Sequence, residues 1–281
     1  MTTAWVLPGG ASMGAVQVGQ AEALLAAGIE PDLLIGASAG SLNAAWLAAD
    51  PTRRGAEVLR SLWLSVPRRA VFPLSPVTIT LGLAGRRDHT VTNEALGRWL
   101  EDHLPYRQID EARLPLTVTA TDLHTGEPVF LTRGALVPAL LASCAMPGVY
   151  PPVLIRDRLL VDGGVAADAP IRRAVRQGAD RIYVLPTLPA GPFARPQGAV
   201  ELLLRTVGLM LGSARNSEIE AWAQVCELYV LPAPSLPTAS PFSFRHTSEL
   251  IERGFELTEA WLPEALPMTA PEASGEASPR P

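Results

Sequence analysis

Two successive strand–turn–helix patterns fill the first 50 residues, and they constrain the fold more than any other feature. Residues 3–7 are apolar and predict a buried strand, a glycine-rich turn follows at residues 9–14, and residues 14–27 have helical spacing. The order repeats with a strand at residues 32–36 and a helix at residues 39–49. Strands that alternate with helices predict a parallel sheet covered by helices, which is an α/β fold.

The rest of the chain continues this alternation as far as a proline-rich end. Further helices are expected at 52–64, 92–103, 135–143, 169–177, about 198–220, and from 247 or 248 to about 262. Further strands are expected at 115–121, 128–132, 158–161, 181–185 and 226–231, with an irregular segment at 66–90. We therefore predict one domain over residues 1–262, followed by a disordered tail over residues 263–281 that is rich in Pro, Ala, Ser and Glu.

Charge and composition exclude several classes of protein. The 281-residue chain has a net charge of −5, which argues against non-specific binding to nucleic acid, so we expect no nucleic-acid partner. All 23 of its basic Lys and Arg residues are arginine, so the chain contains no lysine. Neither a Schiff-base lysine nor a phosphate-binding Walker lysine is therefore available. The two cysteines cannot form a disulfide framework or a Cys-rich zinc site. We expect no metal ion and no cofactor.

Three uncharged stretches, at residues 1–21, 33–49 and 134–155, raise the question of a membrane span. The first lacks the basic start of a signal peptide and is interrupted by glycines, and the second is short and polar. The third contains four prolines, which would break a spanning helix. We therefore expect a soluble, cytoplasmic protein without a signal peptide or transmembrane helix. The low charge still leaves open a peripheral contact with a membrane.

A serine lies between the second predicted strand and the helix that follows it, in the sequence Gly36-Ala-Ser38-Ala-Gly40. A G-x-S-x-G turn in that context is a nucleophile elbow, in which small neighbours let the backbone bend and project the serine. The free N–H groups and the dipole of the following helix favour negative charge beside it. Ser38 is therefore the candidate nucleophile. The alternative is a turn of small residues that packs the helix against the sheet.

The turn after the first strand, Pro8–Gly14, has two interpretations. One is an oxyanion hole, in which backbone N–H groups stabilise a developing negative oxygen; its candidate residues are Gly9, Gly10, Ala11 and Gly14. The other is a dinucleotide-binding loop with Ala11 in place of the second glycine, in which Glu30 or Asp32 would bind the ribose. This second interpretation makes the chain a nucleotide-binding protein and leaves the Ser38 turn unexplained.

An acidic motif, Asp162-Gly163-Gly164, ends a predicted strand. An acid at the carboxyl end of a strand fits the rim of an active site in an open α/β sheet, although an Asp-Gly pair is also an ordinary turn. A histidine is the other kind of partner that Ser38 could use, and the four candidates are His89, His103, His124 and His246. Only His246 comes late enough for the order of an α/β-hydrolase triad. That fold fits poorly, because only one predicted strand precedes the Ser38 strand.

Taken in this order, the three motifs resemble those of the patatin-like phospholipase family, whose members carry a glycine-rich loop, then G-x-S-x-G, then D-G-[AG]. Residues 14–19, 120–126 and 143–148, the last followed by Pro151-Pro152, are also similar, and the resemblance covers about residues 4–185. It implies a three-layer patatin-like α/β fold, in which helices flank a mostly parallel central sheet.

The resemblance also implies a serine acyl hydrolase that acts on lipid esters, of the phospholipase A, lysophospholipase or esterase type. In this family the catalytic dyad contains no histidine, so Ser38 is the implied nucleophile and Asp162 the implied general base of an acyl-enzyme mechanism. The family's loop often reads G-G-G-x-[KR]-G, whereas this chain has Ala11 and Met13 at two of those positions. The backbone N–H survives the change to Ala11, but Met13 removes one contact to an anionic head group.

Two further points stay open at the level of sequence. A catalytically silent lipid-binding module on the same fold is an alternative to the enzyme. The apolar segments 70–85 and 198–212 would either cover the site and hold an acyl chain, or pack on the core.

Overall fold

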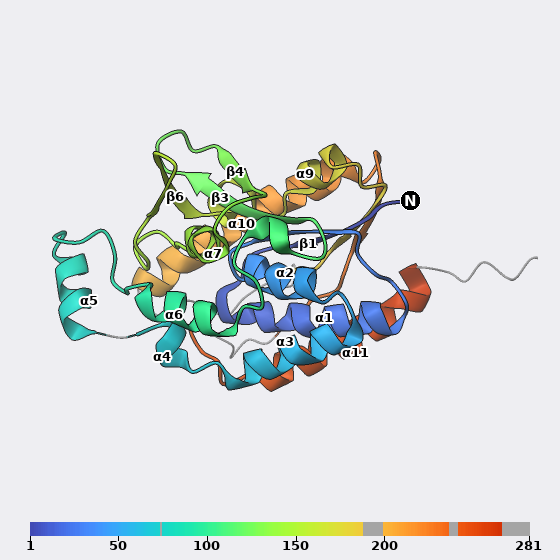
Figure 1. Cartoon of the computed structure of the whole chain (residues 1–281), viewed down its shortest axis with the longest axis horizontal. Helices are drawn as coiled ribbons and strands as arrows, with labels where there is room; N and C mark the ends of the chain where they lie inside the picture. Colours follow the sequence, from blue (N-terminus) through green and yellow to red (C-terminus); the bar gives the residue numbers. More distant parts are fainter. Residues whose placement is uncertain (74, 188–198, 236–240, 266–281) are drawn as a thin grey trace, which may run out of the picture.

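The computed structural model describes residues 1–73, 75–187, 199–235 and 241–265, and places a central sheet between helices (Figure 1). The strands of this described part form one eight-stranded sheet. They are β1 Thr3–Leu7, β2 Leu33–Ala37, β3 Leu116–Asp122, β4 Pro128–Leu131, β5 Val153–Ile155, β6 Arg158–Asp162, β7 Arg181–Val184 and β8 Glu227–Val230.

The strands follow the order β5-β6-β3-β2-β1-β7-β8, and β4 also pairs with β3. The strands β3, β2, β1, β7 and β8 are mutually parallel, whereas β4 and β6 run antiparallel to β3, and β5 runs antiparallel to β6. The predicted α/β fold is therefore confirmed, with a sheet that is parallel through its centre and antiparallel at one side. The hairpin β5–β6 turns at Arg156 and Asp157, whose φ values of 46° and 62° suit a two-residue hairpin loop.

Helices connect and cover these strands. They are α1 Ala15–Ala26, α2 Ala39–Ala49, α3 Arg53–Ser65, α4 Arg68–Val71, α5 Pro76–Leu83, α6 Glu94–His103, α7 Leu136–Ser143, α8 Gly164–Ala167, α9 Ile171–Arg176, α10 Ala199–Trp222 and α11 Thr247–Ala265. Two 3₁₀ turns, Ala11–Gly14 and Ile109–Glu111, precede α1 and β3.

Alternate residues of the central strands belong to two separate apolar clusters. Trp5 and Leu7 pack in a cluster with residues of α1, α2, α3 and α11, whereas Ala4 and Val6 pack in a cluster with residues of α9 and α10. Because successive side chains of a strand point to opposite faces, the sheet is buried on both faces. Figure 1 shows α1, α2, α3 and α11 together on one side of the sheet. The three-layer arrangement follows from this pattern.

The last helix is an integral part of the core, because α11 lies in close contact with α1. A Cβ atom added at Gly19 would lie 1.9 Å from the carbonyl oxygen of Ile251, and one added at Gly254 would lie 2.4 Å from that of Val16. Only glycine permits such a short approach between two helix backbones. A helix well beyond residue 185, where the motifs stop, therefore packs into the same apolar core as α1.

The structure corrects several predictions about elements. Residues 66–90 are not simply irregular, because α4 and α5 lie within them; the Ser75 hydroxyl caps α5 by accepting the Thr78 N–H. The strand β5 and the short helix α8 were not expected. The helix α11 continues through Pro263 to Ala265, so the first three residues of the predicted tail are helical. Residues 266–281 of that tail, and residue 198 of the segment 198–212, lie outside the described residues.

Among the described residues, no helix has the length and apolar character needed to cross a membrane. Instead, the three uncharged stretches of the sequence supply β1, β2 and β5 together with the helices α2 and α7 and much of α1.

Candidate active site

Ser38 occupies a strained turn between β2 and α2. Its φ and ψ angles are 52° and −127°, it is the N-cap of α2, and it is 8% exposed. A positive φ costs a residue with a side chain about 1–2 kcal/mol, so the surrounding packing holds this backbone in place. The flanking glycines make the turn fit, because a Cβ at Gly36 would lie 2.4 Å from Ser41 Cα and one at Gly40 would lie 2.0 Å from the Leu7 oxygen.

The register of the sheet brings Ser38 and Asp162 together. The strand β2 ends at Ala37, which is opposite Thr119 of β3, and β6 ends at Asp162, which is opposite the next residue of β3, Ala120. Because β2 is parallel to β3 and β6 is antiparallel to it, the carboxyl ends of β2 and β6 converge. The Ser38 side chain lies close enough to the Asp162 carboxyl to lower its pKa, and Asp162 is 7% exposed.

The end of α7 holds both of these residues. The Ser38 N–H donates to Ser143 Oγ over 2.9 Å, and the Ser143 hydroxyl donates to the Thr119 oxygen over 2.6 Å. The Asp162 N–H donates to the Ala145 oxygen over 3.0 Å. Ser143 therefore fixes the strained turn to β3. Sequence reasoning missed this role, since the segment 143–148 was noted only for its resemblance to a family.

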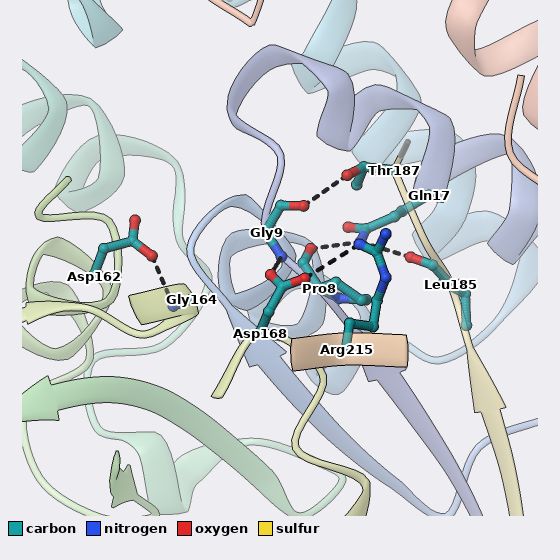
Figure 2. Close-up of polar contacts among 9 residues, drawn as sticks. All are labelled: Pro8, Gly9, Gln17, Asp162, Gly164, Asp168, Leu185, Thr187 and Arg215. Atoms are coloured by element: carbon teal, nitrogen blue, oxygen red, sulfur yellow. Dashed lines mark hydrogen bonds and ion pairs between the residues drawn. The ribbon is translucent and has the colours of Figure 1, made fainter. Parts of the chain in front are cut away.

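The surroundings of Asp162 change its acidity. Burial raises the pKa of the Asp162 carboxyl to about 7, the proximity of the Ser38 hydroxyl and the hydrogen bond from the Gly164 N–H oppose that rise, and the nearby Asp168 charge adds to it. The Gly164 bond is 2.8 Å long and is drawn in Figure 2. A carboxylate with a pKa near neutrality is a stronger base than an ordinary aspartate, and a large fraction of it is ionised at pH 7.

The glycine-rich loop lies directly against Ser38 and is tethered at Gly9. A Cβ added at Gly9 would lie 3.1 Å from Ser38 Cβ. The Gly9 N–H donates to Asp168 Oδ1 over 3.0 Å, and its carbonyl accepts from the Thr187 hydroxyl over 2.6 Å (Figure 2). The Gly9 amide, a candidate for the oxyanion hole, is thus already bonded to Asp168. Within the described part of the chain, the Gly10 and Ala11 amides have no intramolecular acceptor.

The other candidates of the loop have distinct environments. A Cβ at Gly10 would lie 2.3 Å from Thr187 Oγ1, so the loop packs too closely there for a side chain. Ala11 has a φ of 49°, a left-handed angle that glycine adopts without strain. Gly14 lies in the 3₁₀ turn, where a Cβ would lie 2.9 Å from Ala39 Cβ, so its small size brings α2 close.

A buried ion pair supports the loop from the opposite side. Asp168 Oδ2 lies 3.2 Å from Arg215 Nη1 of α10, and the two side chains are only 4% and 11% exposed. Gln17 of α1 adds a second tether by donating to the oxygens of Pro8 and Leu185 over 2.8 and 2.9 Å (Figure 2). Burial raises the pKa of Asp168, and Arg215 opposes that shift. No local sequence pattern indicates this pairing, because it joins residues far apart in the chain.

A pocket that is almost entirely apolar opens beside Ser38. Its walls come mainly from α2, α3 and α6, and none of its lining residues is charged. They are Ala11, Ser12, Ser38, Ala39, Leu42, Asn43, Trp46, Leu59, Leu62, Trp63, Val66, Val71, Phe72, Leu96, Trp99, Cys144, Met146, Tyr150 and Phe244. Burial raises the pKa of the Cys144 thiol, which therefore stays protonated at neutral pH.

Only part of the segment 70–85 reaches this pocket, through Val71 and Phe72. The described side chains of the helix α5, which makes up most of the rest of that segment, do not line it. Where the side chains of α10 are described, they do not line it either, so the pocket is formed without them.

The alternative roles suggested by the sequence have little geometric support. Within the described residues, His246 bonds to Glu249 and His89 to Asp88, and no histidine bonds to Ser38 or Asp162. Asp32 accepts the Thr3 N–H at the amino ends of β1 and β2, whereas the glycine-rich loop follows their carboxyl ends. Asp32 therefore lies at the wrong end of the sheet to bind a ribose next to that loop.

Among the described residues, no group of three or more His, Cys, Asp or Glu side chains could hold a metal ion.

Comparison with known proteins places this site in a family. The sequence profile of the Patatin-like phospholipase family matches residues 5–175. An uncharacterised NTE family protein of Mycobacterium bovis is 32% identical over 116 residues, covering 41% of this chain and 27% of the relative. A protein of Aspergillus terreus named Lysophospholipase nte1 is 26% identical over 188 residues, covering 64% of this chain and 11% of the relative.

A solved structure agrees at the level of the fold. VipD from Legionella pneumophila superimposes with a TM-score of 0.50 at 13% identity, covering 94% of this chain and 67% of that one. The chain spans about a quarter or less of the length of the curated relatives cited above. The motifs, their convergence in the sheet and the profile match lead to one conclusion: this chain belongs to the patatin-like phospholipase family.

Proposed function

We propose that the chain is a serine acyl hydrolase of lipid esters that uses a Ser38–Asp162 dyad. The observation that carries the proposal is the convergence of Ser38, in its strained turn, with the buried Asp162 at the carboxyl ends of β2 and β6, beside an apolar pocket that Ser38 lines. A nucleophile, a base of raised pKa and an apolar cavity are the parts that hydrolysis of a lipid ester needs. The relative named as a lysophospholipase is consistent with this substrate class.

The reaction follows from the positions of these groups. Ser38 Oγ attacks the ester carbonyl carbon while its proton moves to Asp162, and the carbonyl oxygen becomes an oxyanion. The unpaired amides of Gly10 and Ala11, beside Ser38, are the donors proposed to stabilise it. Collapse breaks the ester bond, and the alcohol or lysolipid leaves with the proton from Asp162. Water then attacks the acyl-enzyme with Asp162 as base, which releases the fatty acid and restores Ser38.

The pocket and the loop indicate how a substrate would lie. The acyl chain occupies the apolar pocket, and the head group stays outside, because the lining contains no charged side chain to bind it. Met13, which replaces the basic residue frequent in the family, is buried at 3% exposure and offers no positive charge. The cytoplasmic location and the contact with a membrane surface remain predictions.

The experiment compares hydrolysis of p-nitrophenyl octanoate by the wild type and by three variants. Ser38→Ala and Asp162→Asn should each lose at least about a hundredfold in kcat. Asp122→Asn is the matched control, because Asp122 is as buried as Asp162 but lies in the β3–β4 turn, where it accepts the His124 and Thr125 amides. For the wild type, kcat/KM should fall below about pH 7, as Asp162 becomes protonated.

Full activity of either dyad variant in a folded state would refute the dyad. Loss of activity in His246→Ala, together with an active Asp162→Asn, would favour a histidine base instead. A silent lipid-binding module would bind vesicles and hydrolyse none of the esters.

A further inference from the structure

The apolar pocket follows one face of the helix that carries the nucleophile. Ser38, the N-cap of α2, is followed at four-residue intervals by Leu42 and Trp46 within the helix, and all three line the pocket. Residues four apart lie above one another on the same side of a helix. The pocket therefore starts at the nucleophile and extends along α2 in the direction of Trp46.

Two tryptophans line this channel and pack against each other at the Trp46 end of α2. The Trp46 ring packs against Trp99 of α6 with 5.7 Å between ring centroids, and Trp99 in turn stacks on His103 at 4.4 Å. Leu59 and Leu96 also line the pocket and are 2% and 3% exposed. Trp46 and the two leucines are buried and Trp99 is partly buried, and such a packed floor resists displacement because protein interiors are close-packed.

Among the described residues that line the pocket, Asn43 is the one with an amide side chain, and its hydrogen-bond donors are already used within the protein. Asn43 Nδ2 donates to the Gly14 oxygen and to Gln17 Oε1 over 2.9 and 2.8 Å, and Asn43 Oδ1 accepts the Trp63 indole N–H over 2.7 Å. It therefore has no donor left for a polar group on a substrate. The channel suits an unbranched hydrocarbon chain, for which apolar contact is the main attraction.

The helix supplies a length scale for that chain. Eight residues separate Ser38 from Trp46, and at a rise of 1.5 Å per residue they span about 12 Å. This is an upper value, because helical side chains lean toward the N-terminus and bring the Trp46 ring nearer to Ser38. A chain of tetrahedral carbons with bonds of about 1.5 Å advances about 1.25 Å per carbon, so about eight to ten carbons fit in extended form.

We propose, on the basis of the function proposed above, that this channel selects medium-chain acyl groups of about eight to ten carbons, with Trp46 and Trp99 as the stop. Each methylene group that the channel buries strengthens binding of the acyl chain until the chain reaches Trp46 and Trp99. Longer chains must fold back or leave their ends in water, and they gain nothing from further carbons.

The first arm of the test measures kcat/KM for p-nitrophenyl butyrate, octanoate, decanoate, dodecanoate and palmitate. For the wild type, kcat/KM should rise about fourfold per added methylene up to octanoate or decanoate, the ratio that about 0.8 kcal/mol per buried methylene gives. It should then level off or fall. A value that keeps rising through palmitate would overturn the proposed stop.

Substitutions should move the optimum in opposite directions. Leu42→Trp fills the channel one helical turn from Ser38 and should move it toward butyrate. Trp46→Ala opens the floor and should move it toward dodecanoate and palmitate, and Trp99→Leu serves where Trp46→Ala fails to fold. Trp222→Ala, on the opposite face of the sheet, is the matched control and should keep the wild-type optimum. Unchanged optima in all of the channel variants would contradict the inference.

A second arm separates this inference from the proposed function. Fatty acids are titrated into Ser38→Ala, and their binding is followed by tryptophan fluorescence without any catalysis. Decanoate should bind about as tightly as palmitate and much more tightly than butyrate. If that binding pattern is found and the wild type hydrolyses no ester, the proposed hydrolase function is refuted, while the proposed limit on acyl-chain length stands. Hydrolysis combined with tighter binding of palmitate would refute only the length limit.

Discussion

Replacing Asp162 by asparagine should stabilise the protein at neutral and alkaline pH while it abolishes hydrolysis. The amide keeps the shape of the carboxyl group and can still accept the Gly164 N–H, but it carries no charge. Burial raises the folded-state pKa of Asp162 to about 7, well above its ordinary value. Its contribution to stability is therefore fully present below the unfolded pKa near 4, and it is lost as the pH rises through about 7.

The size of the effect follows from the size of the shift. The pKa rises from 3.8 to about 7, and each pKa unit corresponds to about 1.4 kcal/mol. Ionisation of this one buried group should therefore cost the wild type on the order of 4 kcal/mol in unfolding free energy between about pH 4 and pH 8. The stability of Asp162→Asn relative to the wild type should rise by that amount over the same range.

The assay is urea denaturation of both proteins at several pH values across this range, followed by tryptophan fluorescence and by far-UV circular dichroism. Coincident transitions from the two signals justify a two-state free energy. Taking the difference between the proteins cancels the other titrating groups. Asp122→Asn is the control, since Asp122 is equally buried but accepts two backbone amides and lies 3.9 Å from Arg158. Because the asparagine substitution weakens these charge-assisted contacts, Asp122→Asn should be less stable than the wild type.

Parallel pH curves for the wild type and Asp162→Asn would refute the reasoning. They would mean that Asp162 ionises in the folded protein as readily as in the unfolded chain, and a base of raised pKa would then be absent from the site.

Three further substitutions test the supports of the site and the fold. Ser143→Ala leaves the buried Ser38 amide without its acceptor. Steady-state kinetics should show kcat lowered about tenfold or more, with a smaller change in KM. An unchanged kcat would contradict the positioning role of Ser143. Arg215→Met leaves Asp168 without its ion-pair partner and should lower the free energy of unfolding by about 3–5 kcal/mol, measured by urea denaturation. The double variant Arg215→Met/Asp168→Asn should recover most of that loss. Equal losses in the single and the double variant would argue against the ion pair. Gly19→Ala forces α1 and α11 apart and should lower the free energy of unfolding by about 1–3 kcal/mol. The loss should appear as a lower Tm, and an unchanged Tm would contradict the close contact between the two helices.

The elements that sequence predicted well are those whose signals are local. Apolar runs bounded by glycine turns predicted β1, α1, β2 and α2, and the strand-to-helix context placed Ser38 at a turn that the structure shows to be strained. The parts it missed depend on contacts between distant segments. The helix α5 lies in a proline-rich segment that looked irregular, although Pro76 at its first turn suits a helix start.

Sequence also could not reveal how the site is held together. The motif order suggested that Ser38 and Asp162 act together, but their meeting depends on β6 pairing with β3 just beyond the residues that pair with β2. The tethering of Gly9 by Asp168, and of Asp168 by Arg215, joins three segments with no shared local pattern. The close contact of α1 and α11 at Gly19 and Gly254 also joins distant segments, and neither glycine identifies its partner from sequence alone.

The most direct test of the central claim is covalent labelling of the native protein with a fluorophosphonate. The attacking serine oxygen forms a bond to phosphorus and fluoride leaves, so the adduct marks an activated serine. Mass spectrometry should find the adduct on the peptide that contains Ser38, with slower labelling in Asp162→Asn and none in Ser38→Ala. An adduct on another residue, or an unlabelled Ser38 in the folded wild type, would contradict the account.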